Sequence, residues 1–78
     1  MTKKVVVYST PTCSWCMRVK QFLAENNIPF ENYDVSADQA KAEEMIQKSG
    51  QMGVPVVEVD GAIVVGFDKE KIRELLGI

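Results

Sequence analysis

The sequence predicts an α/β fold built on a four-stranded mixed β-sheet with helices on both faces. Two short strand-like runs are each followed by a segment whose apolar residues recur at helical spacing. Two further apolar runs flank Asp60-Gly61, a dipeptide typical of a two-residue hairpin turn. The elements therefore follow the order strand, helix, strand, helix, strand, strand, helix. Strands joined by a helix should run parallel, and the hairpin adds an antiparallel pair.

The first strand and helix are predicted close to the N-terminus. The run Val5–Tyr8 is short, continuous and β-branched, which is typical of a strand buried on both faces. Residues 9–12 form a turn, and a helix should begin near Cys13 and end at Asn26-Asn27. Residues three and four positions apart form its apolar face: Cys16, Val19, Phe22 and Leu23.

The remaining elements follow in quick succession. Phe30–Val35 alternates weakly and predicts the second strand. Ser36 followed by Gln39 is a capping-box pattern, so a helix should begin there and end at Gly50. Asp68 is predicted to cap the last helix. The hairpin strands are Val56–Val59 and Ala62–Val65, and the buried face of the last helix carries Ile72, Leu75 and Leu76.

The size and composition of the chain indicate a single globular domain and exclude several kinds of binding protein. It has 78 residues, and we expect one domain spanning residues 1–78. With 46% hydrophobic residues and a net charge of −2, it has the composition of a globular domain and lacks the basic surface that nucleic acid or an anionic membrane requires. No segment is long and apolar enough to span a bilayer. We expect a cytoplasmic monomer that binds neither nucleic acid nor membrane.

The chemistry of the chain is predicted to lie in its two cysteines, Cys13 and Cys16. They fall just after a buried strand, at the start of a helix, where unpaired backbone N–H groups and the helix dipole stabilise a thiolate. The thiolate is the species that attacks a disulfide. Cys13, nearer the helix end, should therefore be the nucleophile, and Cys16, one turn along the same face, the resolving thiol.

Three other roles fit the pair less well. A disulfide between residues three positions apart closes too small a loop to constrain the unfolded chain. A buried helical side chain is a reasonable role for Cys16 but not for Cys13, which precedes the helix. A zinc site within one chain needs four ligands, and this sequence has two cysteines and no histidine. We therefore expect redox chemistry and no bound metal.

The chain resembles the glutaredoxin family of the thioredoxin-like fold over essentially its whole length. The resemblance rests on motifs in family order: Val7-Tyr8-Ser9, Cys13-Ser14-Trp15-Cys16, Glu43-Glu44-Met45-Ile46, Ser49-Gly50, Val54-Pro55 and Gly66-Phe67-Asp68. It implies an enzyme that reduces protein disulfides or glutathione mixed disulfides. Glutathione would be a co-substrate, disulfide-containing proteins would be partners, and no cofactor would be bound permanently. Carried over from the family, the residues that bind substrate or glutathione are Thr12, Trp15, Gln51, Val54, Pro55, Gly66, Phe67 and Asp68.

Several of these residues also have simpler explanations. Pro55 can mark the start of a strand, because proline donates no backbone hydrogen bond. Trp15 can be a core aromatic, although between two cysteines in a turn we expect it to be exposed and free to pack against a peptide substrate. Asp68 can be a plain helix cap, and a cap and an anion site can share one helix N-terminus. The charged residues of the last helix are predicted to be solvated surface: Lys69, Glu70, Lys71, Arg73 and Glu74.

Departures from the family leave the source of electrons open. Many members carry a lysine where this chain has Thr10, and a basic residue at the position of Gln51 or Met52. Loss of these cations weakens binding of the glutathione carboxylates. Gly66-Phe67 resembles redoxins that supply ribonucleotide reductase and are reduced by thioredoxin reductase. Ser14, in place of a common proline, resembles members that hold an iron–sulfur cluster between two subunits with glutathione.

Overall fold

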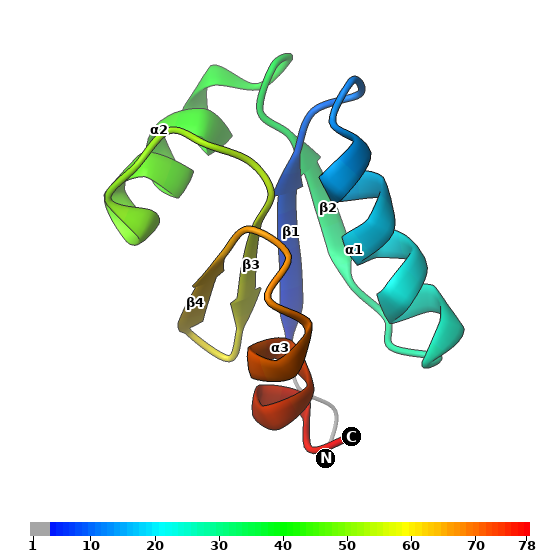
Figure 1. Ribbon diagram of the computed structural model, residues 1–78. Coiled ribbons are helices and arrows are strands. Elements are labelled where there is room, and N and C mark those ends of the chain that lie inside the picture. The colour runs from blue at the N-terminus through cyan, green and yellow to red at the C-terminus, as the bar shows by residue number, and fades with distance from the viewer. Residues whose placement is uncertain (1–3) are drawn as a thin grey trace.

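The computed structural model describes residues 4–78, so residues 1–3 of the predicted domain lie outside the described part of the chain. Within these residues the strands and helices follow the predicted order (Figure 1). The strands are β1 (Val5–Ser9), β2 (Glu31–Asp34), β3 (Val56–Val59) and β4 (Ala62–Val65). The helices are α1 (Ser14–Glu25), α2 (Gln39–Ser49) and α3 (Lys69–Leu76). The predicted fold class is confirmed.

The sheet has the strand order β2-β1-β3-β4. β1 pairs in parallel with β2 and antiparallel with β3, and β3 pairs antiparallel with β4. In this register Tyr8 lies opposite Val56, which in turn lies opposite Val65. The end of β1, the start of β3 and the end of β4 therefore meet at one edge of the sheet. The segments that follow or precede them are brought to the same place.

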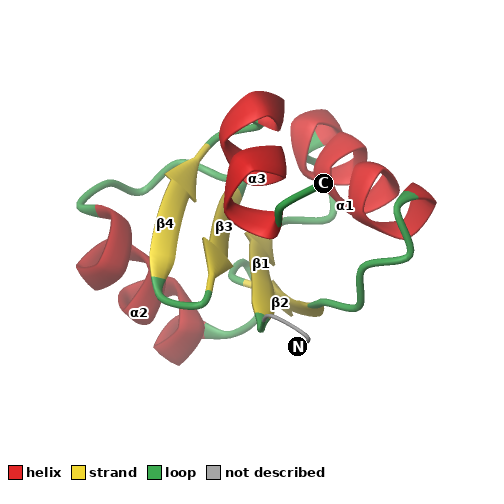
Figure 2. Ribbon diagram, turned by 90° about the horizontal axis from the view of Figure 1, so that it is seen from below, coloured by secondary structure: helices red, strands yellow, loops and turns green. Residues whose placement is uncertain are grey.

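The sheet separates two apolar cores (Figure 2). α1 and α3 cover one face, and α2 covers the other. β1 is buried along its whole length, as its continuous apolar run predicts. Because side chains of a strand alternate between faces, Val5 and Val7 belong to the α1–α3 core, whereas Val6 and Tyr8 belong to the α2 core. This central strand therefore fixes the layers on both sides.

The hairpin between β3 and β4 has the predicted turn. Asp60 and Gly61 both adopt positive φ values, 48° and 90°. A two-residue turn of this kind matches the twist of the strands that it connects, and glycine adopts the second position without steric cost. The turn sets the register that brings Val65 opposite Val56.

The predicted start of α2 is wrong. The capping residue is Asp38, whose Oδ1 accepts a hydrogen bond from the Lys41 N–H at 3.1 Å. Ser36 instead belongs to a turn after β2, where its N–H donates to Asp34 Oδ1 at 2.9 Å. Gln39 is then the first helical residue rather than the third, so the capping-box spacing does not apply. The Ser36 hydroxyl donates to Asp34 within this turn and does not accept a hydrogen bond from an N–H of α2.

α2 is held on the sheet by one buried apolar side chain and by one ion pair. Met45 is buried in the α2 core. Lys48 Nζ lies 3.0 Å from Glu58 Oε1 on β3 and 3.1 Å from Glu44 Oε1 on its own helix. The hydrogen bond with Glu58 is the main reason that the pKa of Lys48 is raised above its ordinary value. No helix within residues 4–78 is long and apolar enough to cross a membrane.

Candidate active site

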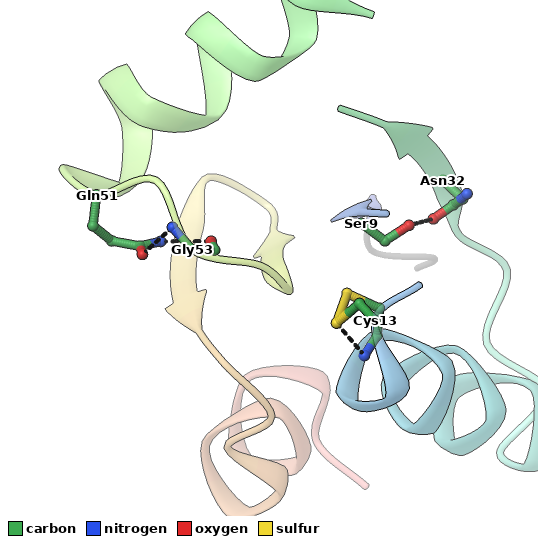
Figure 3. The surroundings of a disulfide bond; sticks show 6 residues. Ser9, Cys13, Asn32, Gln51 and Gly53 are labelled. Atoms are coloured by element: carbon green, nitrogen blue, oxygen red, sulfur yellow. Dashed lines mark hydrogen bonds between the residues drawn. A yellow bond between two sulfur atoms is a disulfide. The ribbon is translucent and has the colours of Figure 1, made fainter. Parts of the chain in front are cut away.

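The turn between β1 and α1 places the two cysteines at the helix start. Ser9, the buried last residue of β1, donates its hydroxyl to Asn32 Oδ1 at 2.7 Å and so ties the strand to β2 (Figure 3). The Cys13 N–H donates to the Thr10 carbonyl at 3.3 Å and closes the turn. The chain therefore enters α1 from a strand end that is fixed on both sides.

Cys13 and Cys16 are joined by a disulfide, with their Cα atoms 5.2 Å apart. Cys13 is the capping residue of α1, and its Sγ accepts a hydrogen bond from the Cys16 N–H at 3.1 Å. A thiolate accepts this bond more strongly than a neutral sulfur does. Cys13 is half-buried, whereas Cys16 is 0% exposed. The pair is therefore asymmetric, with the accessible sulfur at the positive end of the helix.

A groove beside the pair collects several of the predicted binding residues. It has a volume of about 250 Å³ and is lined by Trp15, Val54, Pro55, Gly66 and Phe67. Trp15 is 56% exposed, as predicted for a residue between the two cysteines. The Gly66 N–H donates to the Pro55 carbonyl at 2.8 Å and joins the two loops of the opposite wall. Gly66 has a φ of 77°, a conformation that favours glycine.

The Val54–Pro55 peptide bond is cis. Pro55 is buried and Val54 is half-buried, and both precede Val56, the first ladder residue of β3. Because Val56 lies opposite Tyr8, this segment lies at the sheet edge from which the cysteine turn departs. The register of the sheet thus explains how residues 54 and 55 come to share a groove with Trp15.

Three predicted binding residues do not line the groove: Thr12, Gln51 and Asp68. Thr12 is exposed in the turn before the helix. The Gln51 amide is bound within its own loop, where Nε2 donates to the Gly53 carbonyl at 2.9 Å and Oε1 accepts from the Gly53 N–H at 2.5 Å (Figure 3). Asp68 caps α3, as its simpler explanation predicts, by accepting from the Lys71 N–H at 3.2 Å.

A second cavity lies next to the groove and was missed by the sequence analysis. This α1–α3 pocket has a volume of about 410 Å³ and shares the wall residue Phe67 with the groove. Its lining consists of Arg18, Gln21, Phe22, Glu25, Phe67 and Lys69. The spacing of positions 18, 21, 22 and 25 on one helix face was a signal for it. The sequence instead predicted Phe22 only as core and Lys69 as solvated surface.

The fold and the paired cysteines together define the class of protein, a redox protein with the thioredoxin-like fold. The sequence model of the family described as Glutaredoxin matches residues 5–64. The chain belongs to the glutaredoxin family.

Individual relatives agree with this assignment. An uncharacterized glutaredoxin-like 8.6 kDa protein in the rubredoxin operon of Clostridium pasteurianum is 46% identical over 72 residues, which are 92% of this chain and 96% of that protein. Glutaredoxin 3 of Escherichia coli strain K12 is 34% identical over 64 residues, 82% of this chain and 77% of that protein. The crystal structure of the thioredoxin-like protein BC3987 is similar with a TM-score of 0.88 and 38% identity, covering 94% of this chain and 100% of that chain.

Proposed function

We propose that the chain is a dithiol oxidoreductase that reduces protein disulfides and glutathione mixed disulfides, with glutathione as its thiol co-substrate. The observation that carries this proposal is the asymmetry of the cysteine pair. Cys13 is half-buried at the helix start, and Cys16 is fully buried but within bonding reach of it. Such a reaction requires a compartment in which thiols are kept reduced, and we assign it to the cytoplasm.

The first step is attack by the Cys13 thiolate on one sulfur of the substrate disulfide. A bond forms between Cys13 Sγ and that sulfur, and the other substrate sulfur leaves as a thiolate that takes up a proton. The backbone N–H of Cys16 and the positive end of α1 stabilise the attacking thiolate. The product of this step is a mixed disulfide at Cys13.

The second step closes the disulfide seen in the structure. Cys16 loses its proton and attacks Cys13 Sγ, and the remaining substrate sulfur leaves as a thiolate. The substrate has then gained two electrons, and the protein has lost two. Two glutathione molecules restore the dithiol in the same way and leave as glutathione disulfide. With a glutathione mixed disulfide as substrate, Cys13 and one further glutathione complete the cycle without Cys16.

The groove supports a role in holding the substrate beside Cys13. An extended peptide next to Val54 would pair with the backbone in the manner of an added strand, and Trp15 and Phe67 would pack against its side chains. The N–H groups at the start of α3, near Phe67 and Asp68, suit the γ-glutamyl carboxylate of glutathione.

A second candidate is a dithiol donor that is reduced by thioredoxin reductase instead of glutathione. It is favoured by the neutral residues Thr10 and Met52, and by the Gln51 amide, which is bound to Gly53 within its own loop. In this candidate the chemistry at Cys13 and Cys16 is unchanged, and only the source of electrons differs.

Parallel assays with two reductants test the proposal. The disulfide form is supplied with glutathione and glutathione reductase in one arm, and with thioredoxin reductase in the other. We expect turnover in the glutathione arm. Turnover only with thioredoxin reductase would establish the second candidate in its place.

Two serine variants test the roles of the cysteines. Cys13→Ser should abolish reduction of every disulfide substrate, because no accessible thiolate remains. Cys16→Ser should keep reduction of a glutathione mixed disulfide but lose turnover of a protein disulfide. Full activity of Cys13→Ser would reject its assignment as nucleophile.

A further inference from the structure

We propose that the α1–α3 pocket binds an acidic side chain of the protein substrate, through Arg18 and Lys69. The inference rests on the proposed function, because it names the kind of protein disulfide that the groove accepts. It concerns a part of the surface beyond the groove and beyond the cysteine pair.

The pocket and the groove form one continuous surface. Phe67 lines both cavities. Arg18, which lines the pocket, places its Cζ 5.0 Å from the ring centre of Trp15, which lines the groove. A substrate segment that lies in the groove therefore continues past Arg18 into the pocket.

Each cation lies over an aromatic ring: Arg18 over Trp15 of the groove, and Lys69 over Phe22 of the pocket wall. The Lys69 Nζ lies 5.5 Å from the ring centre of Phe22, and the rings of Phe22 and Phe67 are 5.9 Å apart. Cation–π contacts of this kind hold a charged group in place and leave its outer side open to a partner. The rings also offer an apolar surface to the methylene groups of an aspartate or glutamate side chain.

The charges of the pocket favour an anion. Glu25 is its one acidic residue, and its Oε1 already accepts a hydrogen bond from Gln21 Nε2 at 3.0 Å. Two cations therefore face one carboxylate that has a partner. Asp68 and Glu70 flank Lys69 in the sequence, but neither lines the pocket.

The position of Lys69 is not explained by the stability of its helix. It is the first residue of α3, where the helix dipole disfavours a positive charge. Arg18 lies in the second turn of α1, and the first turn, residues 14–17, contains no acidic residue that could pair with it. Lys69 thus adds a positive charge at the start of α3. A substrate carboxylate would offset the positive charge of both side chains.

The cavity size and the charge distribution indicate the type of substrate and its orientation. A volume of about 410 Å³ accommodates a side chain with part of its backbone. Thr10, Gln51 and Met52, which do not line the pocket, carry no charge. We therefore expect an extended segment with an acidic residue on the α1–α3 side of its cysteine.

The test uses short peptides in which one cysteine is blocked as a mixed disulfide with 2-nitro-5-thiobenzoate. A single glutamate is scanned through the positions on either side of the cysteine, and each peptide has a glutamine counterpart. The rate of release by the reduced protein is measured at low and high salt. At one position we expect the glutamate peptide to react roughly three- to tenfold faster in about 0.01 M salt, and no preference in about 1 M salt.

Substitutions assign the preference to the pocket. Arg18→Gln and Lys69→Gln should each lower the ratio of the glutamate rate to the glutamine rate, and the double variant should bring it to about one. Glu25→Gln should raise the ratio. Lys71→Gln is the matched control, because Lys71 carries the same charge on the same helix but does not line the pocket; it should leave the ratio unchanged.

Three outcomes would overturn the inference. One is equal rates for glutamate and glutamine peptides at every position, which leaves the proposed function intact. Another is a preference that survives the double variant. The third is a fall in the rate of glutathione disulfide reduction by the double variant that is as large as its fall in rate with the glutamate peptide. The pocket would then bind glutathione rather than a protein side chain. Failure to reduce any peptide would instead reject the proposed function itself.

Discussion

The two cysteines of the site differ in their surroundings although they lie within one helical turn. Cys13 caps α1 and accepts a backbone hydrogen bond at its sulfur, whereas Cys16 lies in the interior with 0% exposure. The chain contains no histidine, so no imidazole can take the thiol proton. Stabilisation of the thiolate must come from backbone N–H groups and the helix dipole. This division of roles leads to a prediction about reactivity.

We predict that, in the reduced protein, iodoacetamide alkylates Cys13 with a pH midpoint clearly below the value of about 8.5 found for a free thiol. Cys16 should remain unmodified until the protein is denatured, because reagent cannot reach it. Mass spectrometry of the separated peptides measures both sites, and the Cys16→Ser variant isolates the titration of Cys13. Faster alkylation of Cys16 would reverse the assigned roles.

At the scale of elements, the sequence was sufficient to predict a turn or a helix start wherever no second residue nearby could play the same role. The Asp60-Gly61 hairpin and the helix start at Cys13 were predicted on this basis. At the start of α2, three residues with capping side chains lie within five positions, Asp34, Ser36 and Asp38. The choice among them depends on how β2 ends, and this is a tertiary feature that the local pattern does not contain.

The same reasoning explains which site residues were predicted. The groove residues follow from family motifs, and the sheet register brings those motifs together. The α1–α3 pocket exists only because two helices far apart in the sequence cover the same face of the sheet, so Arg18 and Lys69 could not be paired from spacing. Gln51 was assigned to the substrate, but its amide finds partners in its own loop.

We predict that Asp38→Ala destabilises the protein by about 1 kcal/mol, because the Lys41 N–H loses its capping acceptor. Ser36→Ala should change the stability by less than about 0.5 kcal/mol, since its hydrogen bonds to Asp34 are exposed and lie outside the helix. Urea unfolding of both variants and of the unsubstituted chain measures the difference as a shift of the unfolding midpoint, and we expect the m-value to be the same for all three. A larger loss for Ser36→Ala would restore the capping box as the start of α2.

At the scale of the whole molecule, the oligomeric state depends on which chemistry the cysteines perform. An iron–sulfur cluster needs four sulfur ligands, and each chain has two cysteines. Cys16 is buried beneath Cys13, so the surface of one chain offers a single accessible sulfur. Among residues 4–78, histidine, cysteine, aspartate and glutamate form no group of three or more that could hold a metal ion. A cluster would therefore require two chains and glutathione.

We predict that anaerobic incubation with iron, sulfide and glutathione leaves a colourless monomer, because Cys16 is buried and each chain offers one accessible cysteine sulfur as a ligand. Absorption spectra together with size-exclusion chromatography give the two readouts. Ser14→Pro is the informative control, since it restores the residue common in the family at the position that motivates the cluster. If the chain forms a coloured dimer that Ser14→Pro or Cys13→Ser abolishes, then the accessible sulfur is a cluster ligand and the reductase cycle is not its main role.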